Sequence, residues 1–214
     1  MTMLSRYDRL SCLAKIYFFL CGESMITITP YKPEWKQEFQ EIGRMLRNIL
    51  GDLAIRIDHI GSTSVPNLDA KDIIDIQVTV KALTPELERA MNVAGFERVA
   101  RITSDHIPPE SNADPKEWEK WIFKPESSRR KINLHVRIQN RTNQRYPILF
   151  RDYLRALPMV AQAYGKVKHE LVKYHPEEDM EAYYDIKDPV CDIIIGGAEE
   201  WAKLTNWSQR ESDC

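Results

Sequence analysis

The feature that most limits how this chain can fold is a glycine-serine turn between two predicted strands, the second of which carries a carboxylate. The first strand runs from Arg56 to Ile60, and the turn begins at Gly61-Ser62. Glycine lets the backbone approach a phosphate, while the serine hydroxyl and the following amides can donate to phosphate oxygens. The second strand runs from about Ile73 to Val80 and places Asp75 to bind a divalent metal ion. We therefore expect a site for a phosphorylated ligand at this turn.

Nucleotidyltransferases use this layout to hold a nucleoside triphosphate over metal ions. They usually place a second carboxylate two residues after the first, because alternate residues of a strand point the same way. Here that position is Gln77, which offers a neutral oxygen and no charge, so a pair of metal ions would bind less well. A plainer interpretation is that Gly61-Ser62 is an ordinary turn and Asp75 an ordinary carboxylate of a strand.

The run from Asp58 to Ile76 (DHIGSTSVPNLDAKDIIDI) closely resembles the signature of the GrpB family, whose members are predicted nucleotidyltransferase-fold proteins and are also found fused to dephospho-CoA kinase. Further segments are similar to the family's later motifs: Asn133 to Arg137, Leu149 to Ala156, Tyr164 with Lys168, and Tyr184 with Lys187. The resemblance covers about Met25 to Trp201. It departs at Asn67, where the family usually has glycine, and at Asp72, where it usually has proline.

This resemblance implies an α+β fold with a nucleotidyltransferase-like mixed sheet flanked by helices and a C-terminal helical bundle. It leaves the substrate open, because a fold hosts many activities. The residue pattern is compatible with this fold. Helical spacing predicts helices at Glu34 to Leu50, Pro85 to Gly95, Pro147 to Ala156 and Pro158 to about Tyr174, then two helices separated near Asp188-Pro189. Strands are predicted at Phe96 to Ile102, Trp118 to Lys124 and Ile132 to Ile138, with a polar, mobile loop between the first two.

The strand from Ile132 to Ile138 alternates apolar and polar residues, which places Asn133, His135 and Arg137 on the same side as Asp75. His135 would then lie where many nucleotidyltransferases have a third carboxylate. A neutral imidazole binds Mn²⁺ or Zn²⁺ well and Mg²⁺ poorly. The alternative is that His135 only forms hydrogen bonds on a polar sheet face.

Basic residues crowd the sequence after the predicted loop: Arg129, Arg130, Lys131, Arg137, Arg141, Arg145, Arg151 and Arg155. Such a cluster is either a solvated face or a means of neutralising phosphates. The predicted catalytic and metal-binding residues are Asp75, Gln77 and His135, with Mg²⁺ or Mn²⁺ as the cofactor. The predicted phosphate-binding residues are Gly61, Ser62, Thr63, Ser64, Lys71, Arg137, Arg151, Lys168 and Lys187. The alternative for the last three is an ordinary ion pair with a neighbouring carboxylate.

Composition limits the remaining possibilities. A net charge of -2 over 214 residues argues against a general nucleic-acid binder. The four cysteines have neither disulfide nor zinc spacing, so we expect a cytoplasmic protein. Residues 1–24 read as a dispensable extension and not as a membrane span or signal peptide. A single domain is expected over 25–204, with the sheet at about 25–140 and the helical part at about 145–204. Residues 205–214 are expected to be a frayed polar tail.

The preferred function is metal-dependent transfer of a nucleoside monophosphate from a nucleoside triphosphate to an unidentified acceptor. The alternative is a non-catalytic module that binds a nucleotide or another phosphorylated ligand. An accessory role in coenzyme A metabolism is a third possibility, implied only by the fusions found in the family.

Overall fold

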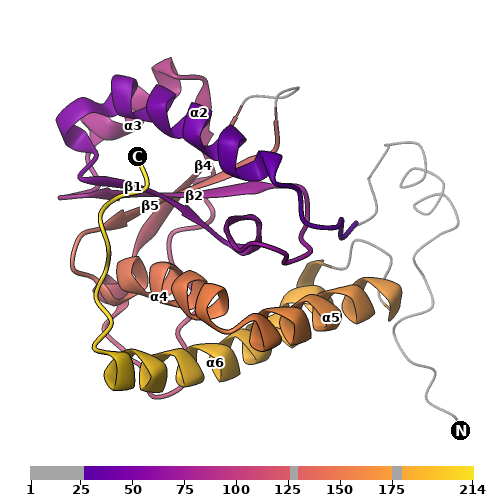
Figure 1. Cartoon of the computed structure of the whole chain (residues 1–214). Helices are drawn as coiled ribbons and strands as arrows, with labels where there is room; N and C mark the ends of the chain where they lie inside the picture. Colours follow the sequence, from indigo (N-terminus) through magenta and orange to yellow (C-terminus); the bar gives the residue numbers. More distant parts are fainter. Residues whose placement is uncertain (1–26, 126–129, 175–179) are drawn as a thin grey trace, which may run out of the picture.

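The computed structural model describes residues 27–125, 130–174 and 180–214. One sheet lies between two layers of helices (Figure 1). The strand order is β1-β2-β5-β4-β3, and only the central pair β2 and β5 is parallel. The strands are β1 Arg56–Ile60, β2 Ile74–Val80, β3 Phe96–Arg98, β4 Lys120–Pro125 and β5 Ile132–Ile138.

Helices α2 (Glu34–Leu50) and α3 (Pro85–Val93) cover one face of the sheet, and α4 (Thr142–Ala156), α5 (Pro158–Tyr174) and α6 (Met180–Thr205) cover the other (Figure 1). Short 3-10 turns occupy Gly51–Leu53, Ser62–Ser64 and Pro115–Trp118. The predicted α+β fold, with a mixed sheet flanked by helices and a C-terminal helical part, is confirmed.

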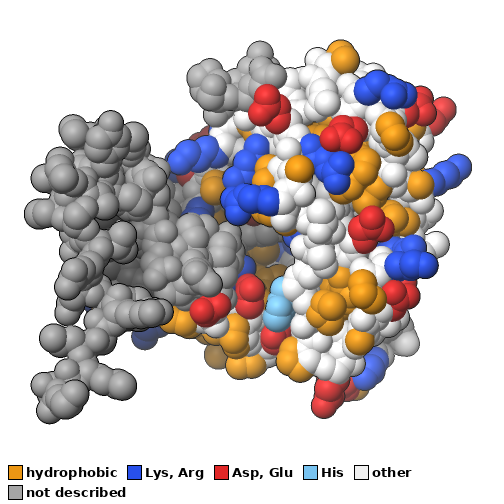
Figure 2. Space-filling view, turned by 180° about the vertical axis from the view of Figure 1, so that it is seen from behind, with side chains coloured by type: hydrophobic (Ala, Val, Ile, Leu, Met, Phe, Trp, Pro, Cys, Tyr) orange, Lys and Arg blue, Asp and Glu red, His pale blue; other side chains and the backbone are white. Residues whose placement is uncertain are grey.

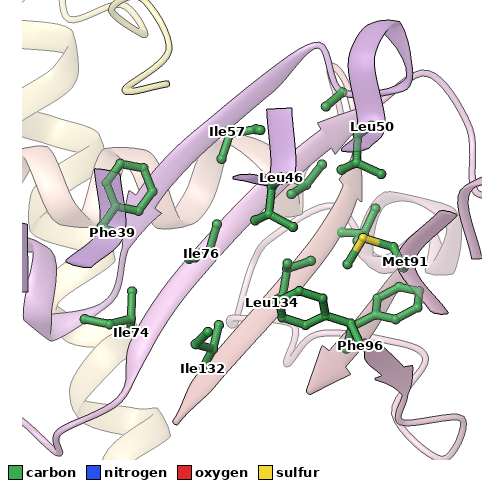
Figure 3. Packing of buried hydrophobic residues seen from close by; sticks show 14 of the residues in the cluster. Phe39, Leu46, Leu50, Ile57, Ile74, Ile76, Met91, Phe96, Ile132 and Leu134 are labelled. Atoms are coloured by element: carbon green, nitrogen blue, oxygen red, sulfur yellow. The ribbon is translucent and has the colours of Figure 1, made fainter. Parts of the chain in front are cut away.

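The main hydrophobic core lies between the sheet and the helices α2 and α3. Side chains of α2 such as Phe39 and Leu46 lie over apolar residues of β1, β2 and β5 (Figure 3). Trp35 is fully buried, as expected, and its indole donates a hydrogen bond to Asp72 (2.8 Å). This packing uses only one side of each strand, since alternate residues point to opposite faces.

The opposite face of the sheet is polar. The register aligns Gln77 with Asp58 of β1 and with His135 of β5, while Arg137 is aligned with Lys120 of β4. Helix α4 covers much of this face, since its residue Gln144 is buried there, accepts from the Gln77 side chain (2.9 Å) through its carbonyl and donates to the Thr79 hydroxyl (3.5 Å). The polar alternation predicted for β2 and β5 is therefore confirmed.

Several predicted element boundaries are wrong. The chain from Met180 to Thr205 forms one helix through Pro189, so it is not divided near Asp188-Pro189 as predicted. Apolar residues after the proline, such as Ile194 and Ile195, pack into the cores of the helical layer and offset the lost backbone hydrogen bond. Helix α4 begins five residues before the expected Pro147, because the Glu117 carboxylate accepts from the Thr142 amide (2.8 Å) and hydroxyl (2.9 Å) at its start.

The C-terminal segment is not frayed. It runs from α6 back to the free edge of β1 (Figure 1). The Cys214 amide donates to the Ile57 carbonyl (3.1 Å), and the Ile57 amide donates to the Ser212 hydroxyl (2.8 Å). Asp213 accepts from the His59 amide (3.0 Å). These bonds satisfy backbone groups that an edge strand would otherwise leave unpaired.

The predicted extension at residues 1–24 lies outside the described residues. Within the described part of the chain, no helix combines the length and the hydropathy needed to cross a membrane.

Candidate functional site

The glycine-serine turn is built around contact between Gly61 and Asp75. Gly61 has φ +69°, a backbone conformation that glycine adopts easily and other residues rarely do. A Cβ atom placed on Gly61 would lie 2.3 Å from Asp75 Oδ2. Glycine is thus required here for two reasons: the backbone has positive φ, and the carboxylate of the next strand leaves no space for a side chain.

Two of the three hydroxyls predicted to bind phosphate point into the protein. Thr63 is buried, and its hydroxyl donates to the Ile73 carbonyl (3.3 Å). Ser64 is also buried, and its hydroxyl donates to the Gly61 carbonyl (2.6 Å). Ser62 is half-buried, and none of the described residues hydrogen-bonds to its hydroxyl. Ser62 is the hydroxyl of this turn that remains available to a ligand.

His59 positions the turn, a role that the sequence analysis missed. Its Nε2 lies 3.0 Å from Thr63 Oγ1, and its ring stacks on Phe39 with centroids 4.7 Å apart. Burial and the nearby charge of Arg155 lower the pKa of His59 to about 3, so the imidazole is neutral. Because the Thr63 proton goes to Ile73, the Nε2 of His59 carries the hydrogen of this bond. The sequence signal for this role was the position of His59, a polar residue on the apolar side of β1.

Asp75 lies at the base of the turn, and its side chain is 26% exposed. Its Oδ1 accepts a hydrogen bond from the Asn133 side chain (2.9 Å) and lies 3.9 Å from His135 Nε2. Asp75 and His135 therefore lie close to each other on adjacent strands, as predicted.

Gln77 is fully buried, and both ends of its amide are engaged. Its Oε1 accepts from the Arg137 guanidinium (2.8 Å), and its Nε2 donates to the backbone carbonyl of Gln144 in α4 (2.9 Å). The oxygen that the sequence assigned to a metal ion is thus bound to a protein cation.

Arg137 belongs to a buried ion pair. Its guanidinium donates to both carboxylate oxygens of Asp105 (2.8 and 2.9 Å), and Lys120 contacts the same carboxylate. Burial opposes ionisation of Asp105, but the charges of Arg137 and Lys120 outweigh it and hold the pKa of Asp105 well below its usual range. Asp105 lies in the loop that was predicted to be mobile, so this partner was missed. Arg137 is committed to the protein and is not turned towards a phosphate.

His135 has both ring nitrogens near charged neighbours. Arg137 Nη2 lies 3.4 Å from His135 Nδ1, so Nδ1 is the acceptor and Nε2, which faces Asp75, carries the hydrogen. Burial lowers the pKa of His135, against the opposing effect of Asp75. A protonated Nε2 cannot ligate a metal ion.

The donor set does not fit a pair of metal ions. Among the described residues, no three His, Cys, Asp or Glu side chains are grouped so as to hold one. Asp58, which is aligned with Gln77 on this face, is already bonded through both carboxylate oxygens by Arg56, and the Gln77 oxygen, two residues along the strand from Asp75, accepts from Arg137.

Three lysines act on one another electrostatically, and we call Lys71, Lys168 and Lys187 the lysine cluster. Lys168 is buried in α5, donates to the Asp69 carbonyl, and lies over the ring of Tyr164, 4.8 Å from its centroid. Burial and the charge of Lys187 lower the pKa of Lys168 to about 7 and that of Lys71 to about 8. Asp75 acts on both lysines in the opposite direction. The cluster and Asp75 therefore share one electrostatic environment.

The described arginines of the basic run are bonded within the protein. Arg130 pairs with Glu38 and Asp72, Arg151 and Arg155 share Asp152, and the others pair with further acidic residues. Arg151 is buried and bonds the His59 carbonyl (3.0 Å) and Asp213 (2.6 Å). Charges of both signs are mixed on the face shown in Figure 2. Arg129 lies outside the described residues.

Two hollows are found elsewhere on the surface. One, of about 490 Å³, is mainly apolar and lies between α5 and the first part of α6. The other, of about 480 Å³, is polar and lies at the start of α4, between Arg56 and Arg145. Gly61, Asp75 and the lysine cluster line neither of them, so the candidate site rests on its chemistry and not on the depth of a pocket.

Comparison with known proteins gives one consistent answer. The model of the family described as "GrpB protein" matches residues 25–196. The chain is 33% identical over 196 residues to a dephospho-CoA kinase of Mycolicibacterium paratuberculosis, covering 85% of this chain and 48% of that protein. It is 32% identical to UPF0157 protein BH1888 of Halalkalibacterium halodurans, covering 79% of this chain and 80% of that protein.

The crystal structure of the conserved protein GrpB from Enterococcus faecalis is 26% identical, with a TM-score of 0.63, and the match covers 82% of this chain and 99% of that one. The chain spans about half the length of the first curated relatives it matches. Together with the family match over most of its length, these likenesses show that the chain belongs to the GrpB family.

Proposed function

We propose that this protein binds a phosphorylated ligand at the Gly61-Ser62 turn, and that the preferred ligand is a nucleoside triphosphate. The observation that supports this most is the packing of the Gly61 turn against Asp75, whose charge in turn acts on Lys71 and Lys168. Ser62 supplies the available hydroxyl, and the ammonium groups supply the positive charge that phosphate oxygens require. Binding needs no second carboxylate, so the replacement at Gln77 does not count against it.

A second candidate is transfer of a nucleoside monophosphate from the triphosphate to an unidentified acceptor. The partly exposed Asp75 carboxylate, held against the turn by Asn133, favours this function. In that case Asp75 would bind one Mg²⁺ or Mn²⁺ ion, which would polarise the phosphate. Gln77 and His135 would act only by hydrogen bonding, because Arg137 already occupies the Gln77 oxygen.

Thermal shift of the purified protein tests the binding proposal. The ligand series is ATP, GTP, CTP and UTP, together with coenzyme A and dephospho-coenzyme A, which are included because of the dephospho-CoA kinase relatives. Each is measured with Mg²⁺, with Mn²⁺ and with EDTA. Stabilisation by one ligand that is lost in Lys187→Gln and kept in Lys203→Gln supports the site, since Lys203 is an exposed lysine paired within its own helix. No stabilisation under any condition overturns the proposal.

Release of pyrophosphate in the presence of candidate acceptors distinguishes transfer from binding alone. If the protein is a transferase, Asp75→Asn abolishes release while leaving the fold and the circular dichroism spectrum intact. If it is a binding module, the same variant changes only the affinity.

A further inference from the structure

The polar hollow at the start of α4 is formed by three segments that are distant in the sequence. Arg56 comes from the start of β1, and Gln209 comes from the C-terminal segment, which passes the start of α4 (Figure 1). The rest of its lining lies between Gln139 and Arg145, in the turn from β5 to α4 and the first turn of α4. The glycine-serine turn is at the other end of β1, since Gly61 follows the last residue of that strand. The volume of about 480 Å³ suits a small molecule.

Every side chain that lines the polar hollow carries a hydrogen-bonding group, and none of them is acidic. The lining consists of three arginines, four carboxamide side chains and one threonine. The arginines are not free charges, because each is paired with a carboxylate outside the lining: Arg56 with Asp58, Arg141 with Glu117, and Arg145 with Glu199. The formal charges of these pairs cancel. The kind of ligand is therefore decided by the hydrogen-bond donors that the pairs leave over, and not by net charge.

Arg141 and Arg145 each bond to their carboxylate through a single nitrogen. Nη1 of Arg141 donates to Glu117 (3.3 Å), and Nη1 of Arg145 donates to Glu199. No other described residue accepts a hydrogen bond from the Nε or Nη2 atoms of these two side chains. A guanidinium presents its N–H groups as forks, so the edge formed by Nε and Nη2 matches two oxygens of a carboxylate or a phosphate. Both arginines retain such an edge.

The guanidinium groups of the hollow are held in place by the protein. Arg56 donates to Asp58 from Nε (3.0 Å) and Nη2 (2.9 Å), and to the Arg210 carbonyl from Nη1 (2.7 Å). The guanidinium of Arg145 lies over the ring of Trp207, 5.3 Å from its centroid. Side chains that are already ordered lose little conformational entropy when a ligand binds.

A pair of amides forms one wall of the hollow. Gln144 Nε2 donates to Gln209 Oε1 (3.1 Å), and Gln209 Nε2 lies 3.4 Å from Gln144 Oε1, to which it donates in return. The oxygens of both amides are thus engaged with each other. This wall therefore favours a ligand that accepts hydrogen bonds over one that donates them.

We infer that the polar hollow binds a small molecule through an oxyanion, a carboxylate or a phosphate, held by the remaining fork edges of Arg141 and Arg145. This site is separate from the one proposed at the Gly61-Ser62 turn. Charge-assisted hydrogen bonds from two guanidinium groups supply the attraction. Glu117 and Glu199 stay on the other edge of each guanidinium and oppose it. The expected affinity is therefore modest, with a Kd of about 1 mM or below.

Isothermal titration calorimetry with sodium phosphate, and separately with sodium citrate, tests this inference at an ionic strength held constant with NaCl. Saturable binding of at least one of the two anions is expected. Binding of phosphate alone identifies a phosphorylated ligand, and binding of citrate alone identifies a carboxylate ligand. Absence of saturable binding of both anions would overturn the inference.

Arginine-to-glutamine variants locate the bound anion. Arg141→Gln and Arg145→Gln should each weaken binding about tenfold, because each removes one fork of charge-assisted bonds. Arg44→Gln is the matched control, since Arg44 is exposed on α2 at the other face of the sheet. Ser62→Ala reports on the glycine-serine turn. Loss of binding in Ser62→Ala, with unchanged binding in both hollow variants, would contradict this inference and support the proposed function instead.

A variant with the opposite expected effect separates binding from damage to the fold. Glu199→Gln removes the carboxylate that competes with the ligand for Arg145, at a position where the side chains are 43% and 39% exposed. It should tighten anion binding several-fold, whereas a loss of structure in the hollow would weaken it. Unchanged or weaker binding in Glu199→Gln, with a wild-type circular dichroism spectrum, would count against the role given to Arg145.

Discussion

The carboxylate of Asp75 occupies the space that a side chain on Gly61 would need, with Oδ2 only 2.3 Å from the position of its Cβ atom. The turn that defines the candidate site and the strand that carries its carboxylate are therefore fixed to each other by direct contact. A substitution at either residue will therefore change the packing of the other.

Gly61→Ala should lower the free energy of unfolding by about 2–4 kcal/mol, from backbone strain at positive φ together with overpacking. Adding Asp75→Ala should recover part of this loss, since it removes the closest contact and leaves one of 2.9 Å. Urea denaturation of the two single variants and the double variant measures the coupling. Gly95→Ala is the control, because Gly95 also has positive φ but nothing within 4 Å. Equal losses at Gly61 and Gly95 would contradict this prediction.

Asp105→Asn should destabilise the protein by about 3–5 kcal/mol at neutral pH, because it leaves the buried Arg137 guanidinium without its counter-charge. The pKa of Asp105 is depressed in the folded protein, so its stabilisation is present above the unfolded value of about 3.9. It is lost as pH falls towards the folded value. Denaturation between pH 7 and pH 2 should therefore show a shallower loss of stability in the variant than in the wild type. Parallel curves would show that folding does not change the pKa of Asp105 and would contradict this prediction.

The affinity for a phosphorylated ligand should fall as the pH rises from 7 to 9. The pKa of Lys168 is about 7 and that of Lys71 about 8, so both lose positive charge over this range, while a terminal phosphate, with a pKa of about 6, is already ionised. Calorimetric titrations in EDTA at several pH values measure the slope. Lys168→Gln should bind more weakly and flatten the profile. An affinity that does not change with pH would show that these lysines do not contact the ligand.

Asp213→Ala should lower stability by about 1–3 kcal/mol, since the carboxylate bonds both the His59 amide and the buried Arg151. Thermal denaturation gives the magnitude, and hydrogen exchange at the His59 amide should accelerate. Glu211→Ala, in the same segment, is the comparison, because the side chain of Glu211 is exposed. Wild-type exchange at His59 in the Asp213 variant would argue against the role assigned to this segment.

The hydrophobic pattern of the sequence predicted the helices and strands whose bounds depend on residues close together in the chain. The helix Glu34–Leu50 and the strand Ile132–Ile138 have the expected bounds because each carries a complete apolar period, and the strand Arg56–Ile60 has them because the Gly61 turn ends it. Pro189 was taken for a boundary because its penalty is local, whereas the packing of Ile194 and Ile195 that overcomes it is tertiary.

The candidate site was predictable as a set of strand positions but not as a set of bonds. Alternation correctly placed Asp75, Gln77 and His135 on one face, since the period of a strand is fixed. What each polar atom bonds to depends on residues distant in sequence. Gln77 is engaged by Arg137, and Arg137 in turn by Asp105 from a loop without periodicity. The inward rotation of the Thr63 hydroxyl depends on nearer residues, His59 and Ile73, whose side-chain and carbonyl positions follow only from the folded turn.

The C-terminal segment also bears on the order in which the protein folds. Ile57 and Ser212 are separated by 155 positions, so the bonds between them close one of the longest loops in the chain. Loops of this length are costly in entropy until the intervening structure has formed, and contacts between distant residues are made slowly. The outer edge of β1 should therefore be among the last parts of the sheet to gain protection in refolding, after its pairing with β2. Until then the strand is open to pairing with other chains, so refolding yield should decline as protein concentration rises.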